Sequence, residues 1–244
     1  MLANRHLFLK SGWRWLKSIL LPSTCILCSI TVDRHIDLCA ACENDLPRLT
    51  TVCSICAIPL VIKDSQSIIC GHCLQQPPAF FAVTALFHYQ PPIDNFITGL
   101  KFQQQLLYAR LLGELLSGRL QQKYQCQSLP ELIIPVPLHA ARLRERGFNQ
   151  ALEIARPIAK KLKIPIDISR CERVRMTAAQ SLLPAEERQV NIKNAFKVKL
   201  PFDAKYVAVV DDVITTGHTV NELSKVLKQA GVQRIDVWSV ARTS

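Results

Sequence analysis

Short apolar runs alternate along this chain with longer segments in which apolar residues recur at helical spacing. Four runs of strand length occupy residues 82–89, 132–136, 207–210 and 234–240. Segments of helical periodicity occupy residues 93–122, 149–162 and 220–230. Continuous apolar runs indicate strands buried on both faces, as in a parallel sheet. Strands alternating with helices therefore predict an α/β fold with a doubly wound parallel sheet, whose ligands bind beyond the carboxyl ends of the strands.

Glycines predict where the helical segments stop or break. We expect the segment 93–122 to be interrupted near Gly99 and Gly113, because glycine weakens a helix interior. Gly231 is placed to end the helix that follows the run at 207–210. The chain of 244 residues is 49% hydrophobic, which is ample for a packed core.

No segment contains about 18 consecutive uncharged apolar residues, so we expect no membrane span. Residues 1–24 mix basic and large apolar side chains without a signal-peptide cleavage site. This pattern favours an amphipathic helix that packs on the protein, or touches lipid peripherally or a partner.

The residues that follow the run at 207–210 carry the most specific chemistry. The run is expected to end at two adjacent carboxylates, Asp211 and Asp212, which precede a loop of hydroxyl-bearing residues and glycine. A strand that feeds a tight loop into a helix N-terminus forms a phosphate cradle, since backbone N–H groups, the helix dipole and hydroxyls converge there. The carboxylates at the strand end can reach a sugar's hydroxyls or a magnesium ion. The pattern predicts a sugar phosphate as ligand.

This segment resembles the 5-phosphoribosyl-pyrophosphate (PRPP) signature of type I phosphoribosyltransferases. By that resemblance, Asp211 and Asp212 hold the ribose hydroxyls. The residues implied for the 5-phosphate are Thr215, Thr216, Gly217, His218 and Thr219. His218 occupies the variable position of the loop, which favours a structural or solvent-facing role. Thr215 stands where 6-oxopurine enzymes carry aspartate, which argues against a purine acceptor.

Eight of the ten cysteines form four C-x-x-C pairs, namely Cys25/Cys28, Cys39/Cys42, Cys53/Cys56 and Cys70/Cys73. Two such pairs complete a tetrahedral, all-thiolate zinc site, so the chain predicts one or two structural Zn²⁺ ions. Sequential pairing and a cross-braced arrangement are both open. A disulfide framework is disfavoured because a PRPP-type site implies the reducing cytosol.

The charge of the chain is strongly positive, with a formal net charge of +11. Residues 142–199 hold 14 basic and 6 acidic residues, a net of +8. Within this block, Arg142, Arg144 and Arg146 alternate ahead of a glycine, and such arginines grip a pyrophosphate or line a nucleic-acid track. A charged surface without a ligand is the alternative interpretation.

Taken together, these segments resemble the ComF/GntX family of competence proteins. The resemblance spans residues 25–241 and rests on motifs in addition to the cysteine pairs and the DDVITTGHT segment. These are Lys101-Phe102 at the head of a helix, Pro135-Val136-Pro137, Arg146-Gly147-Phe148-Asn149-Gln150, and the series Thr177, Gln180, Leu183, Arg188, Asn191 and Phe196.

The resemblance implies a small double zinc-ribbon domain followed by a domain of the type I phosphoribosyltransferase kind. It also implies a role in natural transformation, in which the protein handles incoming single-stranded DNA in the cytoplasm beside a helicase-like competence partner. We therefore predict an amphipathic segment at 1–24, a double zinc ribbon at 25–78 and a phosphoribosyltransferase-like domain at 79–244.

The resulting prediction is a DNA-uptake competence factor with a site for PRPP and Mg²⁺. The alternatives are an active phosphoribosyltransferase with an unidentified acceptor and a PRPP sensor without turnover. The sequence assigns no catalytic residue.

Overall fold

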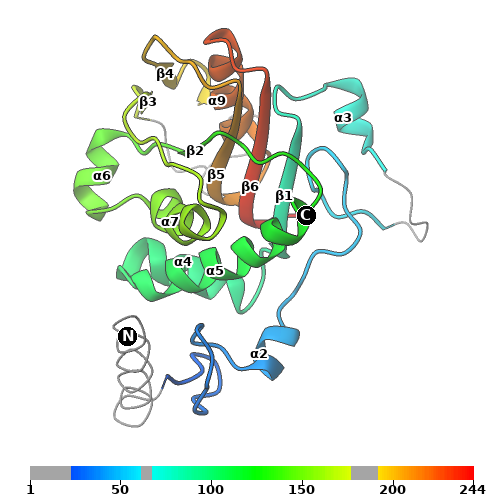
Figure 1. Ribbon diagram of the computed structural model, residues 1–244, viewed down its shortest axis with the longest axis vertical. Coiled ribbons are helices and arrows are strands. Elements are labelled where there is room, and N and C mark those ends of the chain that lie inside the picture. The colour runs from blue at the N-terminus through cyan, green and yellow to red at the C-terminus, as the bar shows by residue number, and fades with distance from the viewer. Residues whose placement is uncertain (1–22, 62–67, 177–191) are drawn as a thin grey trace, which may run out of the picture. The chain divides into compact units, whose positions relative to one another are not determined.

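A computed structural model describes residues 23–61, 68–176 and 192–244 (Figure 1). The predicted amphipathic helix, except for its last two residues, lies outside the described residues. So do positions 177, 180, 183, 188 and 191 of the family motif. The chain divides into two compact units, one ending at Leu46 and one running from Pro47 to Ser244. We refer to the second as the sheet unit.

The first unit contains the first two cysteine pairs. Its described part includes the helix α2 (Ala40–Asn44) and a bridge between Thr24 and Thr31. The Arg34 guanidinium donates to the Leu38 carbonyl at 2.9 Å and to the Glu43 carboxylate at 2.6 Å, which ties the turn before α2 to the helix itself.

The sheet unit is built on four parallel strands in the order β1-β6-β5-β2 (Figure 1). Their bounds are Ala82–His88, Arg234–Arg242, Tyr206–Ile214 and Leu132–Pro135. A separate antiparallel pair joins β3 (Cys171–Arg173) to β4 (Phe196–Val198). The helices of this unit are α3 (Gly71–Gln75), α4 (Ile93–Gln103), α5 (Leu106–Lys123), α6 (Ala140–Arg146), α7 (Gln150–Leu162) and α9 (His218–Gln229).

Two of the expected element ends were wrong. Strand β5 does not stop at the acids but continues through Asp211 and Asp212 to Ile214, because its partner β6 extends to Arg242 and keeps pairing with it. The helical segment after β1 breaks at Gln104, which adopts a left-handed φ of 56°, and not at Gly99 or Gly113. Lys101 and Phe102 consequently lie at the C-terminal end of α4, and not at the head of a helix as expected.

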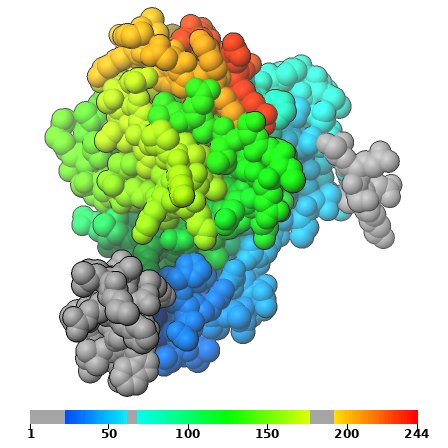
Figure 2. Space-filling view, viewed as in Figure 1, coloured from blue at the N-terminus to red at the C-terminus, as the bar shows by residue number. Residues whose placement is uncertain are grey.

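Helices cover both faces of the sheet, as the doubly wound pattern requires. The β5 residues Val207 and Val209 pack in one core cluster with Val220 and Leu223 of α9. Successive strand residues point to opposite faces, so Ala208 and Val210 face the other side, where α5 and α7 contact the strands. In the space-filling view, the yellow-green range that includes α7 and β3 forms much of the visible face of this unit (Figure 2).

The connections leaving β2 and β5 run in opposite directions across the sheet. From β2 the chain passes through α6 and α7 and bridges back to the outer side of β2 at Ile133 and Ile166. From β5 it passes through α9 to β6. Right-handed crossovers then place the two connections on opposite faces, which opens a crevice beyond the carboxyl ends of β2 and β5.

The cysteine pairs Cys53/Cys56 and Cys70/Cys73 also belong to the sheet unit, because the compact units divide between Leu46 and Pro47. Ala57, which follows the Cys53–Cys56 turn, is 1% exposed and lies in the same core cluster as Val83 of β1. The division at residue 78 that we expected from sequence signatures stays a prediction. Among the described residues, no helix is long and apolar enough to cross a membrane.

The contact between α5 and α7 depends on a glycine. A Cβ on Gly113 would lie 2.5 Å from the Ile154 backbone oxygen of α7, whereas a Cβ on Gly118 in the same helix meets nothing within 4 Å. We expect Gly113→Ala to cost about 1–3 kcal/mol through overpacking and to lower the unfolding midpoint by about 2–12 °C.

The matched variant Gly118→Ala is expected to raise the midpoint, since alanine is about 0.5–1 kcal/mol better than glycine inside a helix. Differential scanning calorimetry measures both changes. Equal effects of the two substitutions would contradict the close α5–α7 contact.

Candidate functional site: a basic cavity with two tetracysteine centres

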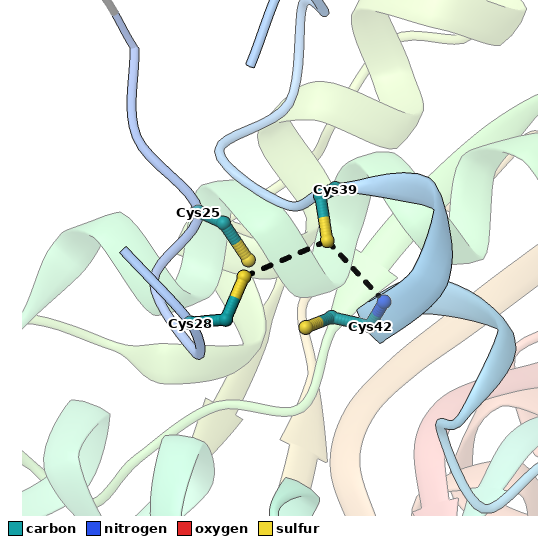
Figure 3. Close-up of side chains that lie close together, drawn as sticks. All are labelled: Cys25, Cys28, Cys39 and Cys42. Atoms are coloured by element: carbon teal, nitrogen blue, oxygen red, sulfur yellow. Dashed lines mark hydrogen bonds between the residues drawn. The ribbon is translucent and has the colours of Figure 1, made fainter. Parts of the chain in front are cut away.

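The first centre gathers the sulfur atoms of Cys25, Cys28, Cys39 and Cys42 (Figure 3). Two turns supply them, one at residues 25–28 and one that leads from Cys39 into α2. All four Sγ atoms lie within 4.8 Å of one another. The Cys42 backbone N–H donates to Cys39 Sγ at 3.4 Å, an interaction that holds this sulfur toward the other three (Figure 3).

The second centre repeats this arrangement inside the sheet unit. It consists of Cys53, Cys56, Cys70 and Cys73, again with all four Sγ atoms within 4.8 Å of one another. The Cys70 N–H donates to Cys53 Sγ at 3.3 Å. The centres therefore follow the sequential pairing of the four motifs and not the cross-braced one.

Both centres fit tetrahedral zinc. A Zn–S bond of about 2.3 Å in a tetrahedron places neighbouring sulfur atoms about 3.8 Å apart. The distance between the Sγ atoms of Cys28 and Cys39 is 3.7 Å, as is that between Cys56 and Cys70. With four thiolates the coordination shell is complete, so such an ion supplies folding energy and no open catalytic position.

Local hydrogen bonds prepare one sulfur of each centre for a metal. Burial opposes ionisation of Cys25, yet backbone N–H groups of Cys39, Cys28 and Leu27 lower the pKa of its thiol to about 6. Burial likewise opposes ionisation of Cys53, and backbone N–H groups lower its pKa to about 7. The thiolate is the form that binds metal, so these backbone N–H groups favour metal binding by Cys25 and Cys53.

A separate cavity of about 510 Å³ lies beyond the carboxyl end of β5. Its acidic lining residues are Glu145 and the pair formed by Asp211 and Asp212, which we call the acid pair. Its cationic lining residues are Lys101, Arg142, Arg146 and Arg173. Four different elements therefore bring charged groups to the switch point of the sheet: α4, α6, β3 and β5.

The acid pair is held in place by its own backbone and by α4. The Asp212 N–H donates to Asp211 Oδ1 at 2.9 Å, and the Val213 N–H donates to Asp212 Oδ1 at 2.8 Å. Lys101 Nζ lies 2.7 Å from Asp212 Oδ2. Burial, with repulsion from Asp212, raises the pKa of Asp211 well above the usual range of a carboxyl group. Burial opposes the charge of Lys101, but the attraction of Asp212 outweighs it and raises the pKa of the lysine.

The three arginines expected to bind pyrophosphate or DNA lie on one short helix, α6. Arg142 and Arg146 are four residues apart, so they share a face and both line the cavity. Arg144 is two residues from each, is exposed, and does not line the cavity. Helical geometry thus divides the set into two cavity residues and one surface residue.

The motif around these arginines sets the orientation of α6. His139 Nδ1 accepts from the Ala141 N–H at 3.3 Å and caps the start of the helix. Gly147 ends it with a φ of 82°. Asn149 donates to the Val136 carbonyl at 3.0 Å and accepts from the Ala151 N–H at 3.0 Å, which ties the end of β2 to the start of α7.

Residues 215–219, which we call the phosphate loop, run from the end of β5 into α9. Gly217 is the N-cap of α9 with a φ of 82°, a conformation that glycine adopts at little cost. Thr215 and Thr219 line the cavity, and Gly217 borders an adjoining hollow with both of them. Thr216 Oγ1 is buried and has no hydrogen-bond partner in the described part of the chain, and Thr216 lines neither the cavity nor this hollow.

His218 is the first residue of α9 and borders a different pocket, together with Lys193, Asn221 and Glu222. His218 does not line the cavity that Thr215 and Thr219 border, and the structural or solvent-facing role expected for it stays a prediction. Its proposed part in binding the 5-phosphate stays a prediction.

Two cavity cations were not among the site residues predicted from the sequence. Lys101 is four residues after the fully buried Ile97, so both lie on the apolar face of α4. A lysine on such a face could have been recognised in the sequence as a candidate site residue. Arg173 ends β3, and burial together with repulsion from Arg142 lowers its pKa to about 10. Its segment showed no periodicity from which its direction could be derived.

Two protein-family models match the chain. The double zinc ribbon domain matches residues 16–74, and the phosphoribosyl transferase domain matches residues 149–243. These matches confirm the predicted fold class, an α/β fold with a parallel sheet of the phosphoribosyltransferase kind preceded by a zinc-ribbon region.

Bacterial relatives match most of the chain. The DNA utilization protein YhgH of Salmonella typhimurium is 35% identical over 228 residues, which cover 91% of this chain and 98% of that protein. Competence protein F of Haemophilus influenzae is 38% identical over 210 residues, which cover 84% and 90%. The crystal structure of a purine phosphoribosyltransferase from Pyrococcus horikoshii matches at 16% identity and a TM-score of 0.31. The match covers 55% of this chain and 80% of that one.

The different surroundings of the two centres predict different effects of their loss. Elemental analysis of the purified chain should find two zinc ions. Cys28→Ser with Cys42→Ser is expected to remove one and to leave unfolding of the sheet unit unchanged, since the first centre belongs to the other compact unit. Cys56→Ser with Cys73→Ser is expected to remove the other and to lower the unfolding midpoint of the sheet unit, because Ala57 belongs to its core.

Calorimetry with zinc analysis on both double variants measures these effects. A single zinc in the wild-type chain, or identical melting of the two variants, would contradict the assignment.

Proposed function

Because this chain belongs to the ComF/GntX family, whose relatives are named competence and DNA utilization proteins, we propose that it is a competence factor with a site for PRPP and Mg²⁺. In this proposal the protein acts in the cytoplasm and handles incoming single-stranded DNA. The observation that carries the PRPP part is one cavity that combines the acid pair, the phosphate loop and four cationic side chains.

The charges of the cavity suit a ligand with several phosphate groups. Its lining has four cationic side chains and three carboxylates. Burial lowers the pKa of Arg146, and burial with repulsion from Arg142 lowers that of Arg173, so an anionic ligand beside them would stabilise their charged forms. A pyrophosphate placed between Arg142 and Arg146 would do so through charge-assisted, bidentate hydrogen bonds.

The remaining groups suit the rest of PRPP. The phosphate loop supplies two threonine side chains to the cavity and the N-terminus of α9, and these fit a 5-phosphate. The acid pair lines the same cavity as the loop threonines and the arginines, and it fits the ribose hydroxyls. Carboxylate oxygens are also ligands that magnesium favours, and the ion would neutralise charge on the pyrophosphate.

Lys101 gives the acid pair a partner before any ligand binds. Its ammonium group lies 2.7 Å from Asp212 Oδ2, so the buried carboxylate is not left uncompensated. Lys101 also lines the cavity, so it could turn toward phosphate oxygens when ribose hydroxyls and a cation occupy the acid pair. We propose this exchange of partners as the role of Lys101 in binding.

The DNA part of the proposal rests on the family and on charge. Residues 142–199 carry a net charge of +8, and Arg144 presents a cation outside the cavity on the exposed side of α6. Such a surface suits the phosphates of a single strand. A helicase-like competence protein is the partner we propose for handing the strand over.

A second candidate, an active phosphoribosyltransferase, is favoured by the rim of the same cavity. Tyr89, Phe102 and Gln104 line it in addition to the acid pair, and Phe102 is 73% exposed. An aromatic rim of this kind offers a stacking surface to a planar acceptor. Release of pyrophosphate from PRPP in the presence of candidate acceptors would distinguish turnover from binding alone.

The acid pair is tested by PRPP-dependent thermal stabilisation. At a PRPP concentration of 100 times Kd with Mg²⁺, the wild type should gain about 2.7 kcal/mol, or about 5–10 °C in the unfolding midpoint. Asp211→Asn with Asp212→Asn is expected to abolish this gain, because it removes the charges that hold the sugar and the ion. The exposed Asp203→Asn should keep the full gain. Undiminished stabilisation of the double variant would refute the site.

The division of the arginines on α6 is tested with both ligands. Arg142→Gln and Arg146→Gln are each expected to weaken PRPP binding at least about tenfold, the loss of about 1.4 kcal/mol or more from a charged hydrogen bond. Arg144→Gln should leave PRPP affinity unchanged and should reduce the salt slope of single-stranded DNA binding by about 0.7, the value for one lost phosphate contact. Isothermal titration calorimetry and fluorescence anisotropy measure the two effects.

If Arg144→Gln weakens PRPP binding as much as Arg142→Gln and Arg146→Gln do, the assignment of Arg142 and Arg146 to the cavity side of α6 and of Arg144 to its exposed side is wrong.

A further inference from the structure

Arg242, the last residue of β6, contacts both the second tetracysteine centre and the phosphate loop. It is 5% exposed, so its charge is buried. Its Nε donates to the Cys56 carbonyl at 3.1 Å. Its Nη1 donates to the carbonyls of Ile214, at 3.1 Å, and Thr215. One guanidinium thereby joins a metal-binding turn to the residue that opens the phosphate loop.

The contacts on the loop side orient its backbone amides. In a planar trans peptide, the carbonyl of one residue and the N–H of the next point in opposite directions. The Ile214 carbonyl also accepts from the Thr243 N–H at 3.1 Å. The distinct contribution of Arg242 is therefore its hold on the Thr215 carbonyl, which directs the N–H of Thr216 away from the guanidinium. A phosphate cradle needs such fixed amides, because an anion binds where N–H groups are already aligned. Arg242 does not line the cavity and acts from behind the loop.

The contacts on the cysteine side depend on a closed turn at residues 53–56. The Ala57 N–H donates to the Cys53 carbonyl at 2.9 Å within this turn, and the Val83 N–H of β1 donates to the Ile55 carbonyl at 2.7 Å. The direction of the Cys56 carbonyl is thus set by the turn that carries two of the four sulfur ligands. Four thiolates around one Zn²⁺ also leave a net charge of about −2 on the centre, which stabilises a buried cation beside it.

We propose that Arg242 is a positioning residue that couples metal binding at the second centre to phosphate binding in the loop. With the centre closed around its metal, Arg242 is held by Cys56 and in turn holds Thr215. Without the metal, the turn loses its cross-link and the guanidinium loses both a carbonyl acceptor and a negative neighbour. The loop then loses order and binds phosphate groups more weakly.

This inference deepens the proposed function and rests on its assignment of the loop to phosphate. It makes the PRPP site dependent on the metal or thiol state of the second centre. Coupling between two sites is reciprocal, so a ligand in the loop must also slow metal loss from the centre.

The coupling is tested by zinc release to a chromogenic chelator with and without PRPP and Mg²⁺. The full chain carrying Cys28→Ser and Cys42→Ser serves as background, so that the released zinc comes from the second centre. PRPP is expected to slow release by about 5–150-fold, the usual range of coupling between sites. Adding Arg242→Gln should reduce this factor to less than about twofold, whereas adding the exposed α7 variant Arg156→Gln should preserve it.

Hydrogen exchange decides the same question without PRPP. Removal of zinc from the second centre should accelerate exchange of the amides at 215–219 in the chain with Arg242, while the amides of Val207–Val210 stay protected because their strand is buried. In Arg242→Gln the loop should exchange fast whether or not zinc is present. Loss of protection in β5 as well would mean that Arg242→Gln disturbs the sheet itself. The experiment is then repeated with Arg242→Lys, which keeps the positive charge but lacks the guanidinium fork.

Unchanged loop exchange on zinc removal, or equal slowing of zinc release by PRPP in the Arg242 variant, overturns the coupling. Absence of PRPP binding to the wild type would instead refute the proposed function, and the exchange experiment would still decide the coupling.

Discussion

The position of β5 within the sheet is the constraint on which the candidate site depends. The strand is hydrogen-bonded to β2 on one side and to β6 on the other, and its residues Val207–Val210 are fully buried. The pairing with β2 reaches Val210, and β6 keeps pairing with β5 through Ile214, so the backbone that carries the acid pair is held by β6. The acid pair and the phosphate loop therefore begin from a fixed point, as preorganised recognition of a charged ligand requires.

Charge balance explains why the cavity is built from several elements. Two carboxylates at the end of a buried strand repel each other, and burial adds to the cost of ionising Asp211. Lys101 from α4 compensates Asp212 directly, and the arginines of α6 and β3 surround the pair at the cavity wall. The cavity lining then holds four cationic side chains and three carboxylates, a balance that suits the anionic ligand we propose for it.

The two tetracysteine centres have the same chemistry but different structural consequences. Each brings four sulfur atoms to distances that suit tetrahedral zinc. The first lies in the smaller of the two compact units. The second packs its turn into the core of the sheet unit and shares Arg242 with the phosphate loop. If the proposed coupling holds, a zinc ribbon that supports a ligand site would be a physical reason to keep both domains in one chain.

Much of this protein was determined by its sequence alone, because the decisive patterns are local. The spacing of the C-x-x-C pairs, the apolar run before the acid pair and the alternation of strands with helices depend on residues a few positions apart. The bounds of the elements were less accessible. Strand β5 extends beyond its apolar run because β6, about thirty residues later in the chain, continues to pair with it.

The tertiary structure alone decided which charged residues share a site. Arg142 and Arg146 were separated from Arg144 by the helical rotation of α6, Lys101 reached Asp212 from another helix, and Arg242 met Cys56 across 186 positions of sequence. No local pattern encodes such contacts. They arise from the direction of each side chain once the elements are packed, and that direction is fixed by the whole fold.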